Sequence, residues 1–281
     1  MRRKALIYQL LVLILCGSSP AQRVQFAPAD KAAVLERMKA IPETNAARAL
    51  KLKELFSDAG CNGNSLMEQK VDGVDSPNII CWLGAEEGDT VIVGAHYDRN
   101  SSAQRPLDNW SGAAILPALY QSLRTRKRSH SFVFVAFADS GSNPVGAEVF
   151  VNHMARKQLD RVEAMVNVDA LGLSPTKVWS AHSDKNLVHS LMVMVYALKL
   201  PASQIDIAAA GATDSDPFAA RHIPQITIHS LTQQNVTTGA TTQFRPNNYY
   251  DTYRLLCGYL AYLDESLKPR QHSERMIYPG I

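Results

Sequence analysis

The residues best suited to chemistry in this sequence are a histidine and aspartates that follow apolar segments. His96 and Asp98 close the apolar run Thr90–Asp98 (TVIVGAHYD). Side chains two positions apart share one face of a strand, and a carboxylate beside a histidine commonly orients it as a metal ligand. We therefore predict that Asp98 orients His96. A histidine at a strand end is more often structural, so this pattern alone does not establish a metal site.

Two further aspartates have the right surroundings. Asp108 precedes a helical segment, where the simplest role of an aspartate is that of an N-cap. Asp169 lies in the apolar run Ala164–Gly172 (AMVNVDALG), and a buried carboxylate is costly unless it is paired or bound to a metal. His96, Asp108 and Asp169 together offer the nitrogen and oxygen ligands that suit zinc, with water in a fourth position.

The elements that must position these groups alternate between strands and helices. Helices are predicted over residues 28–59, from Trp110 onward, and in the segments VGAEVFVNHMAR, DKNLVHSLMVMVYALKL and NYYDTYRLLCGYLAYLDESL. Strands are predicted at Asn78–Leu83, Thr90–Asp98, Ser131–Phe137, Ala164–Gly172, KVWSA and PQITIHS. The fold class that follows is a three-layer α/β sandwich, with a central mixed, mostly parallel sheet and helices on both faces.

Two of these strands carry more specific expectations. Ser131–Phe137 is apolar on both faces, which is typical of a central strand covered on both sides. The short AEEGD segment between the first two strands predicts a hairpin or tight connection.

Composition limits the classes of function. The chain has 281 residues, of which 46% are hydrophobic and 20% are charged, as in ordinary globular proteins. The net charge of +3 is spread along the chain, and the short run Arg124–Arg128 is its main basic cluster. Nucleic-acid binding normally needs a larger basic surface, so no nucleic-acid partner is expected.

The N-terminus has the pattern of an export signal. MRRK precedes the apolar run Ala5–Cys16, which is short for a membrane-spanning helix, and cleavage after Ala21 fits its small-residue pattern. We predict a signal peptide at 1–21, a single domain at 22–281, a secreted or periplasmic protein, and no membrane association after cleavage. Lipoprotein processing at Cys16 is disfavoured by the bulky Leu15.

The cysteines do not settle a disulfide. Cys61, Cys81 and Cys257 remain after cleavage, an odd number in an oxidising compartment. Cys61 and Cys81 flank a loop that closes onto a strand. The sequence leaves open whether they pair or stay as buried thiols.

The order of motifs resembles a known family. HYD, DNWSGAA, FVFVAF, VNVD, DSDPFAARHIP and TIHS follow one another as in the two-zinc exopeptidases of the bacterial leucyl aminopeptidase type, whose fold glutaminyl cyclases share. The resemblance runs from about Ala46 to Leu263. It implies that His96, Asp108 and Asp169 bind one zinc ion, with Asp108 bridging to a second. The second ion would add a glutamate and a late histidine, while a neighbouring glutamate serves as the general base.

The sequence departs from that family where the second zinc site should be. Aligning Val145 and Gly146 on the family's turn puts Ser140 at the position of the base and Gly141 at that of the glutamate ligand. Asp139 is one position early, which would redirect its side chain, and Glu148 is expected to be a solvated charge on a helix. The loop after TIHSLTQ holds no histidine. His222 and His229 are weak candidates to replace it.

These departures define three hypotheses. The first is a secreted zinc aminopeptidase-like enzyme that hydrolyses N-terminal peptide bonds with one zinc ion and impaired activity, because a lost base typically costs about two to four orders of magnitude in rate. The alternative is a catalytically inactive relative that binds one zinc ion or a peptide. A metal-free structural domain is disfavoured by the intact zinc trio. Glutaminyl cyclase activity is disfavoured because it uses the missing glutamate and histidine.

Overall fold

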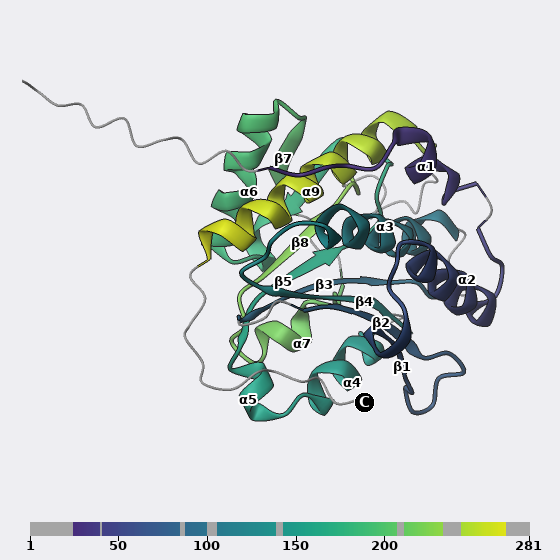
Figure 1. Cartoon of the computed structure of the whole chain (residues 1–281). Helices are drawn as coiled ribbons and strands as arrows, with labels where there is room; N and C mark the ends of the chain where they lie inside the picture. Colours follow the sequence, from purple (N-terminus) through teal and green to yellow (C-terminus); the bar gives the residue numbers. More distant parts are fainter. Residues whose placement is uncertain are drawn as a thin grey trace, which may run out of the picture.

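In the described part of the chain, a mixed sheet of eight strands forms the middle layer, in the order β1-β2-β4-β3-β5-β8-β6-β7 (Figure 1). The neighbouring strands β4, β3, β5 and β8 run parallel, while β1–β2, β2–β4 and β6–β8 pair antiparallel. The strands are β1 Leu66–Gln69, β2 Asn78–Leu83, β3 Thr90–His96, β4 Ser131–Phe137, β5 Val162–Val168, β6 Thr176–Trp179, β7 Ala202–Ile205 and β8 Gln225–His229.

The computed structural model describes residues 25–39, 41–84, 88–99, 106–138, 143–206, 211–232 and 243–267. Within the helix that begins at Pro106, side chains are described from Trp110 onward. The predicted signal peptide, the residues Asp139, Ser140 and Gly141, and most of the late loop lie outside these ranges.

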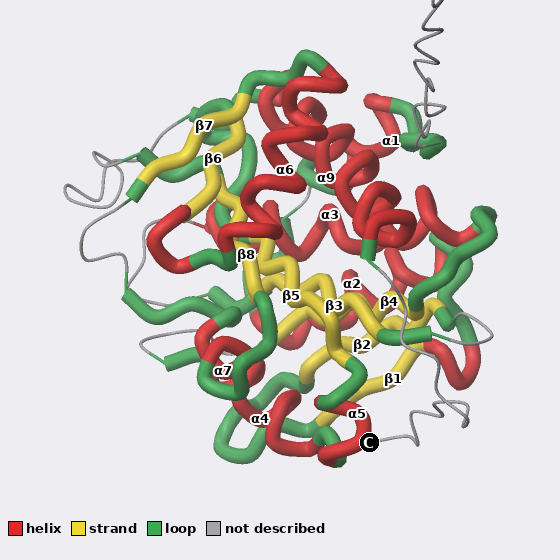
Figure 2. The backbone as a smooth tube through the Cα atoms, turned by 90° about the vertical axis from the view of Figure 1, so that its left-hand side faces the viewer, coloured by secondary structure: helices red, strands yellow, loops and turns green. Residues whose placement is uncertain are grey.

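Helices cover both faces of the sheet (Figures 1 and 2). One layer contains α1 Lys31–Glu36, α2 Asn45–Asp58, α3 Pro106–Arg124, α6 Lys185–Leu198 and α9 Pro246–Ser266. The opposite layer is made of the shorter helices α4 Val145–His153, α5 Arg156–Leu159 and α7 Asp216–Ala219. Single 3₁₀ turns occur at Gly63–Ser65 and Ser180–His182. The predicted three-layer α/β sandwich with a mixed, mostly parallel sheet is confirmed.

Two hydrophobic clusters hold the layers together, because successive side chains of a strand face opposite sides. In β3, Val91 and Val93 pack into the larger cluster with α2, α3, α6 and α9, whereas Ile92 packs into the smaller one. The smaller cluster joins the sheet to α4 and α7 and includes mutual ring contacts of Phe137, Phe150 and Phe218. The smaller cluster's face of the sheet also carries the candidate site.

Three expectations about elements were wrong or incomplete. The helix expected over residues 28–59 is two helices, and the second is capped by the Thr44 hydroxyl, which accepts a hydrogen bond from the Ala47 N–H at 3.2 Å. Of the hairpin or tight connection expected between β2 and β3, the hairpin does not form, because β4 lies between the two strands and pairs with both. The connection itself is short, residues 84–89. The edge strands β1 and β7 were missed, being four residues long and only partly buried.

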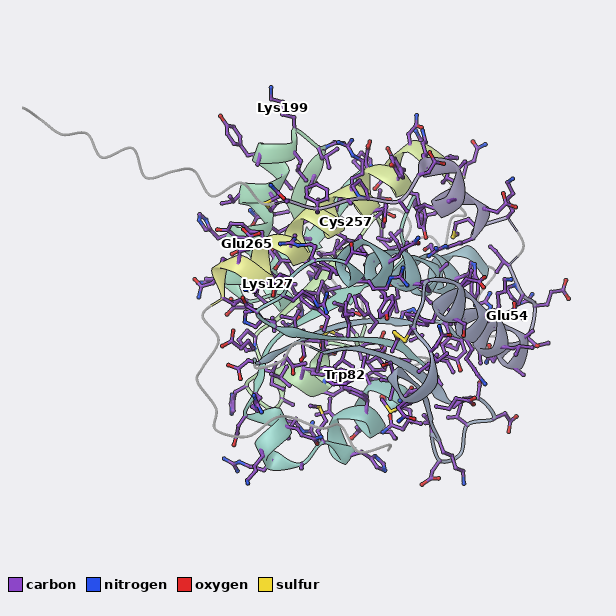
Figure 3. All side chains as sticks on the ribbon, in the orientation of Figure 1. Glu54, Trp82, Lys127, Lys199, Cys257 and Glu265 are labelled. Atoms are coloured by element: carbon purple, nitrogen blue, oxygen red, sulfur yellow. A yellow bond between two sulfur atoms is a disulfide. The ribbon has the colours of Figure 1, made fainter. Side chains whose placement is uncertain are left out.

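A disulfide joins Cys61, just after α2, to Cys81 in β2, which answers the question that the sequence left open. Cys257 is a buried free thiol in α9 (Figure 3). None of the helices in the described part of the chain is long and apolar enough to cross a membrane.

Candidate metal centre

His96 and Asp169 meet at the carboxyl ends of two neighbouring parallel strands. β3 and β5 are in register with Gly94 opposite Asn167, so His96 and Asp169 follow at the same level two residues later. A Cβ atom on Gly94 would contact Phe137 and Met165, which places this side of β3 on the face covered by α4 and α7. In α/β proteins, ligands usually bind at the carboxyl ends of the parallel strands.

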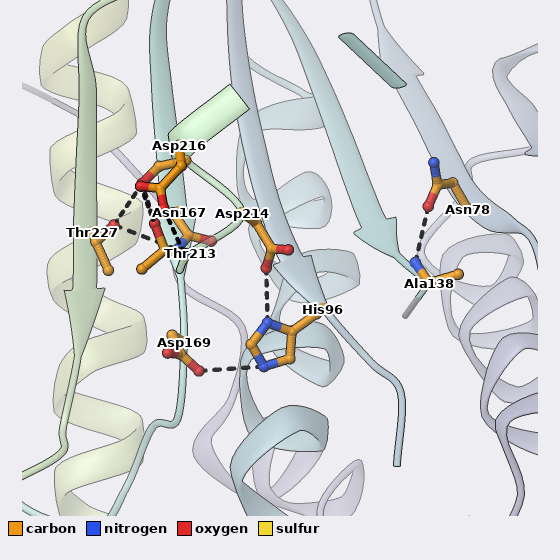
Figure 4. Close-up of polar contacts among 10 residues, drawn as sticks. Asn78, His96, Ala138, Asn167, Asp169, Thr213, Asp214, Asp216 and Thr227 are labelled. Carbon is orange, nitrogen blue, oxygen red and sulfur yellow. Dashed lines mark hydrogen bonds and ion pairs between the residues drawn. The ribbon is translucent and has the colours of Figure 1, made fainter. Parts of the chain in front are cut away.

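Both ring nitrogens of His96 face carboxylates (Figure 4). Nδ1 lies 2.7 Å from Oδ2 of Asp214, and Nε2 lies 3.5 Å from Oδ1 of Asp169. The side chain of Asp214 is 1% exposed, whereas those of His96 and Asp169 are 15% and 22% exposed. The imidazole therefore has a buried partner behind it and a more accessible one in front.

The surrounding charges favour a cation at this position. Burial disfavours the charged imidazole, but Asp214, Asp169 and Asp98 outweigh it and raise the pKa of His96 to about 10. Burial also raises the pKa of Asp169, and the nearby His96 acts in the opposite direction. Because such a carboxylate ionises readily only beside a positive charge, it pairs favourably with an imidazolium or a metal cation.

The geometry of His96 and Asp169 fits zinc. Zinc ligands lie about 2.0–2.2 Å from the metal, so two ligand atoms of one tetrahedral site are about 3.4 Å apart. The 3.5 Å between Nε2 of His96 and Oδ1 of Asp169 matches that spacing. A carboxylate on the other nitrogen of a metal-bound histidine fixes its tautomer, and Asp214 is placed to do so.

The third predicted ligand belongs to a helix that is docked at the same edge. Gly112 of α3 approaches β5 so closely that a Cβ atom there would lie 2.5 Å from the Val168 carbonyl oxygen. The Ser111 hydroxyl accepts the N–H of Leu171 at 2.8 Å. The backbone of Asp108 lies one turn earlier in α3, and its side chain is outside the described residues. Among the described side chains, no group of three or more His, Cys, Asp or Glu is placed to hold a metal.

Asp214 was not selected from the sequence as a site residue. It supplies the hydrogen bond to Nδ1 of His96 that we expected from Asp98. Asp98 is buried, and its negative charge contributes to the raised pKa of His96. Burial lowers the pKa of Arg48 to about 10, and the charge of Asp98 opposes this shift. Arg48 in turn donates to the backbone carbonyls of Tyr97 and Asp98, which anchors the chain just after His96. The sequence signals for Asp214 were the polar turn Thr213–Asp216 and its place in the DSDPFAARHIP motif, neither of which names its partner.

The turn that should carry the base is tied to the sheet at both of its ends. The Asn78 side chain accepts the N–H of Ala138 at 2.9 Å (Figure 4). It also donates to the carbonyl of Gly146 at 2.8 Å. Asp139, Ser140 and Gly141 lie between these two anchors, outside the described residues. Glu148 is exposed on α4, as the sequence predicted.

Neither of the replacement histidines is placed as a zinc ligand. His222 is exposed and lines a cavity of 810 Å³ with Val162, at the opposite end of β5 from Asp169. His229 is buried in β8, and its Nδ1 accepts the N–H of Leu231 at 3.1 Å. Burial and the charge of Lys177 lower the pKa of His229 to about 4. The ring is therefore neutral with its proton on Nε2, which leaves that nitrogen no lone pair for a metal.

The fold and this site define an α/β protein with a candidate metal-binding pair at the carboxyl ends of parallel strands. The sequence matches the model of peptidase family M28 over residues 78–254. This match covers more than half of the chain, and the protein belongs to that family.

A curated relative supports the assignment over part of its length. Aminopeptidase YwaD of Bacillus subtilis (strain 168) is 28% identical over 106 residues, which are 38% of this chain and 22% of that protein. This chain therefore aligns with about a fifth of that relative.

Solved structures share the fold. The Legionella pneumophila LapA aminopeptidase superposes with a TM-score of 0.70 at 16% identity, covering 84% of this chain and 71% of that one. The zinc aminopeptidase BSAP from Bacillus subtilis gives 0.57 at 20% identity, covering 69% and 52%. Fimbriiglobus ruber glutaminyl cyclase gives 0.67 at 15% identity, covering 85% and 97%.

Proposed function

We propose that this protein is an exported, zinc-dependent exopeptidase-like member of family M28 that acts on the N-termini of peptides, with impaired activity. The observation that carries the proposal is the His96–Asp169 pair, whose facing atoms are separated by the spacing of two ligands of one zinc ion. His96, Asp169 and Asp108 would hold one ion per chain.

The chain's own residues have distinct tasks in this proposal. Asp214 keeps a proton on Nδ1 of His96, which leaves the Nε2 lone pair for the metal. Asp169 supplies negative charge beside it. When bound, zinc would act as a Lewis acid toward the carbonyl group of the scissile peptide bond.

The expected weakness of catalysis follows from the residues at the base position. When Val145 and Gly146 are aligned on the family's turn, Ser140 takes the position expected for the glutamate that accepts a proton. A serine hydroxyl is a poor proton acceptor at neutral pH, so the attacking water would lose its general base. The second zinc ion would also lack ligands, because Gly141 has no side chain and His229 presents a protonated Nε2.

Export is supported by two independent features. The N-terminal sequence has the charged start, apolar run and small residues of a signal peptide. The Cys61–Cys81 disulfide fits an oxidising compartment. We accordingly propose a secreted or periplasmic location, a peptide as the partner, and neither nucleic acid nor membrane as a binding partner.

Metal analysis of the purified chain tests the proposal directly. We expect one zinc ion per chain, lost in both Asp169→Ala and His96→Ala. Two zinc ions per chain would contradict the single-site proposal, and none would contradict zinc binding altogether.

The second candidate function is a catalytically inactive protein that binds zinc or a peptide, favoured by the serine at the base position. Hydrolysis of aminoacyl-nitroanilide substrates separates the two. Turnover that disappears in Asp169→Ala supports the enzyme, whereas zinc binding without turnover supports the inactive protein.

A further inference from the structure

We propose that Thr227 and Ser215 are positioning residues, which hold Asp214 against His96 through a one-directional chain of hydrogen bonds that starts on the sheet. The inference rests on the proposed function, because it concerns the carboxylate behind the proposed zinc-binding histidine. It assigns a role to buried polar residues that the proposed chemistry does not otherwise use.

The chain of hydrogen bonds runs from two strands into the turn that carries Asp214 (Figure 4). Asn167 Nδ2 in β5 lies 3.4 Å from Thr227 Oγ1 in β8, and Thr227 Oγ1 lies 3.0 Å from Ser215 Oγ. Ser215 Oγ lies 2.7 Å from Thr213 Oγ1, which donates to Asp216 Oδ1 at 3.1 Å. Four side-chain contacts thus link the sheet to both flanks of Asp214.

The direction of every bond in this chain is fixed by its carboxylate end. Each hydroxyl has one proton to donate, and an ionised carboxylate can only accept. Thr213 gives its proton to Asp216, so Ser215 must donate to Thr213. Thr227 must then donate its one proton to Ser215. In its contact with Asn167, Thr227 is therefore the acceptor, and the amide nitrogen of Asn167 is the donor. No other proton arrangement satisfies all four contacts.

Burial strengthens the hydrogen bonds of this chain. Asn167, Thr227 and Asp214 are each 1% exposed, and Ser215 is fully buried. Hydrogen bonds are stronger in such a poorly polarisable environment, and aligned ones polarise one another. A buried polar group that loses its hydrogen-bond partner destabilises the folded state, so the turn has one favoured position on the sheet.

Asp214 sits between the two anchored residues of that turn. Thr213 and Ser215 flank it directly, and the Thr213 N–H also binds Asp216 Oδ2 at 3.0 Å. The turn points Ser215 at the sheet and Asp214 at Nδ1 of His96, 2.7 Å away. Removing the Thr227 hydroxyl would disconnect the turn from β8, and the placement of the Asp214 carboxylate would loosen as a result.

Two readouts on the full chain test this inference. The first is the Nδ1–H proton signal of His96 in the metal-free protein, recorded by NMR on ¹⁵N-histidine-labelled chain and assigned with His96→Gln. The second is zinc affinity, measured by competition with a chelator. Thr227→Val removes the hydroxyl and keeps the β-branched shape, and Thr227→Ser keeps the hydroxyl. Thr176→Val is the matched control, since Thr176 and Thr252 share a buried hydroxyl contact of 2.7 Å elsewhere in the fold.

We expect Thr227→Val to shift or broaden the His96 signal and to weaken zinc binding about tenfold, as outer partners of metal ligands commonly do. Thr227→Ser and Thr176→Val should resemble the unaltered protein. A Thr227→Val protein that matches Thr176→Val in both readouts would overturn the inference. Should Thr227→Val not fold, Ser215→Ala breaks the same chain and must show the same losses. If the unaltered chain binds no zinc, the proposed function fails, and the NMR comparison alone decides the positioning role.

Discussion

Asp214 Oδ2 lies 2.7 Å from Nδ1 of His96, although 118 positions separate the two residues in the sequence. This contact joins the turn before α7 to the end of β3. It gives the imidazole a buried carboxylate on one side, while Asp169 faces its other nitrogen. A histidine held in this way presents Nε2 in a fixed direction, which is what a metal ligand requires.

Changing Asp214 to asparagine should weaken zinc binding. The amide removes the negative charge behind His96 and offers a weaker partner to Nδ1, so we expect zinc affinity to fall about 10-fold to 100-fold. Chelator competition measures this change. Asp206→Asn is the control, because Asp206 also accepts side-chain and backbone hydrogen bonds, from Ser180 and Ala181, but at an exposed site. Equal affinities for the two variants would show that Asp214 does not support the metal ligand.

Restoring glutamates at 140 and 141 should not restore full peptidase activity. Ser140→Glu combined with Gly141→Glu returns the base and one ligand, but the late histidine is still absent and His229 cannot replace it. We expect the double variant to remain at least about tenfold below full family-level rates in aminoacyl-nitroanilide hydrolysis. Full activity with two bound zinc ions would mean that another residue supplies the missing ligand.

Asn78→Ala should destabilise the fold strongly. Its buried carboxamide donates to Gln69 and Gly146 and accepts from Ala138, so truncation leaves buried backbone groups without partners. We expect the free energy of unfolding to fall by about 3 kcal/mol. Denaturant titration measures it. Asn247→Ala, which removes an exposed contact with Lys31, should cost less than about 0.5 kcal/mol. Similar losses in both variants would contradict the role given to Asn78.

His130 should make stability depend on pH. Its burial disfavours the charged ring, but the hydrogen bond and charge of Asp264 and the charge of Glu163 raise its pKa above 6.5. A raised pKa in the folded state stabilises the protein below the unfolded-state value of about 6.5, and this contribution is lost as pH rises through the folded-state value.

The matching experiment compares His130→Gln with the unaltered chain by denaturant unfolding from about pH 5.5 to 9. The stability difference should be largest at the acidic end and shrink toward the basic end. His189→Gln, a change at an exposed position in α6, is the control for replacing a histidine away from Asp264 and Glu163. A stability difference for His130→Gln that grows with rising pH would contradict a raised pKa of His130 in the folded state.

How far the sequence predicts the site can be judged from its individual residues. His96 and Asp169 stood out because each ends an apolar run, and strand register then brings them to one level of the sheet. Asp214 could not be found in this way, since its turn has no periodicity and its partner is set by how α7 packs. Of the two connections predicted between β2 and β3, the hairpin does not form for a similar reason, because the pairing of β4 with both strands is a long-range contact.

The sequence alone determined the alternation of strands and helices, the α/β class and the residue types at two strand ends, since these depend on local periodicity and burial. Tertiary structure decided which acid binds Nδ1 of His96 and that Cys61 pairs with Cys81. Each of these outcomes depends on distances between segments far apart in the chain. Such distances are fixed only when the layers pack against one another.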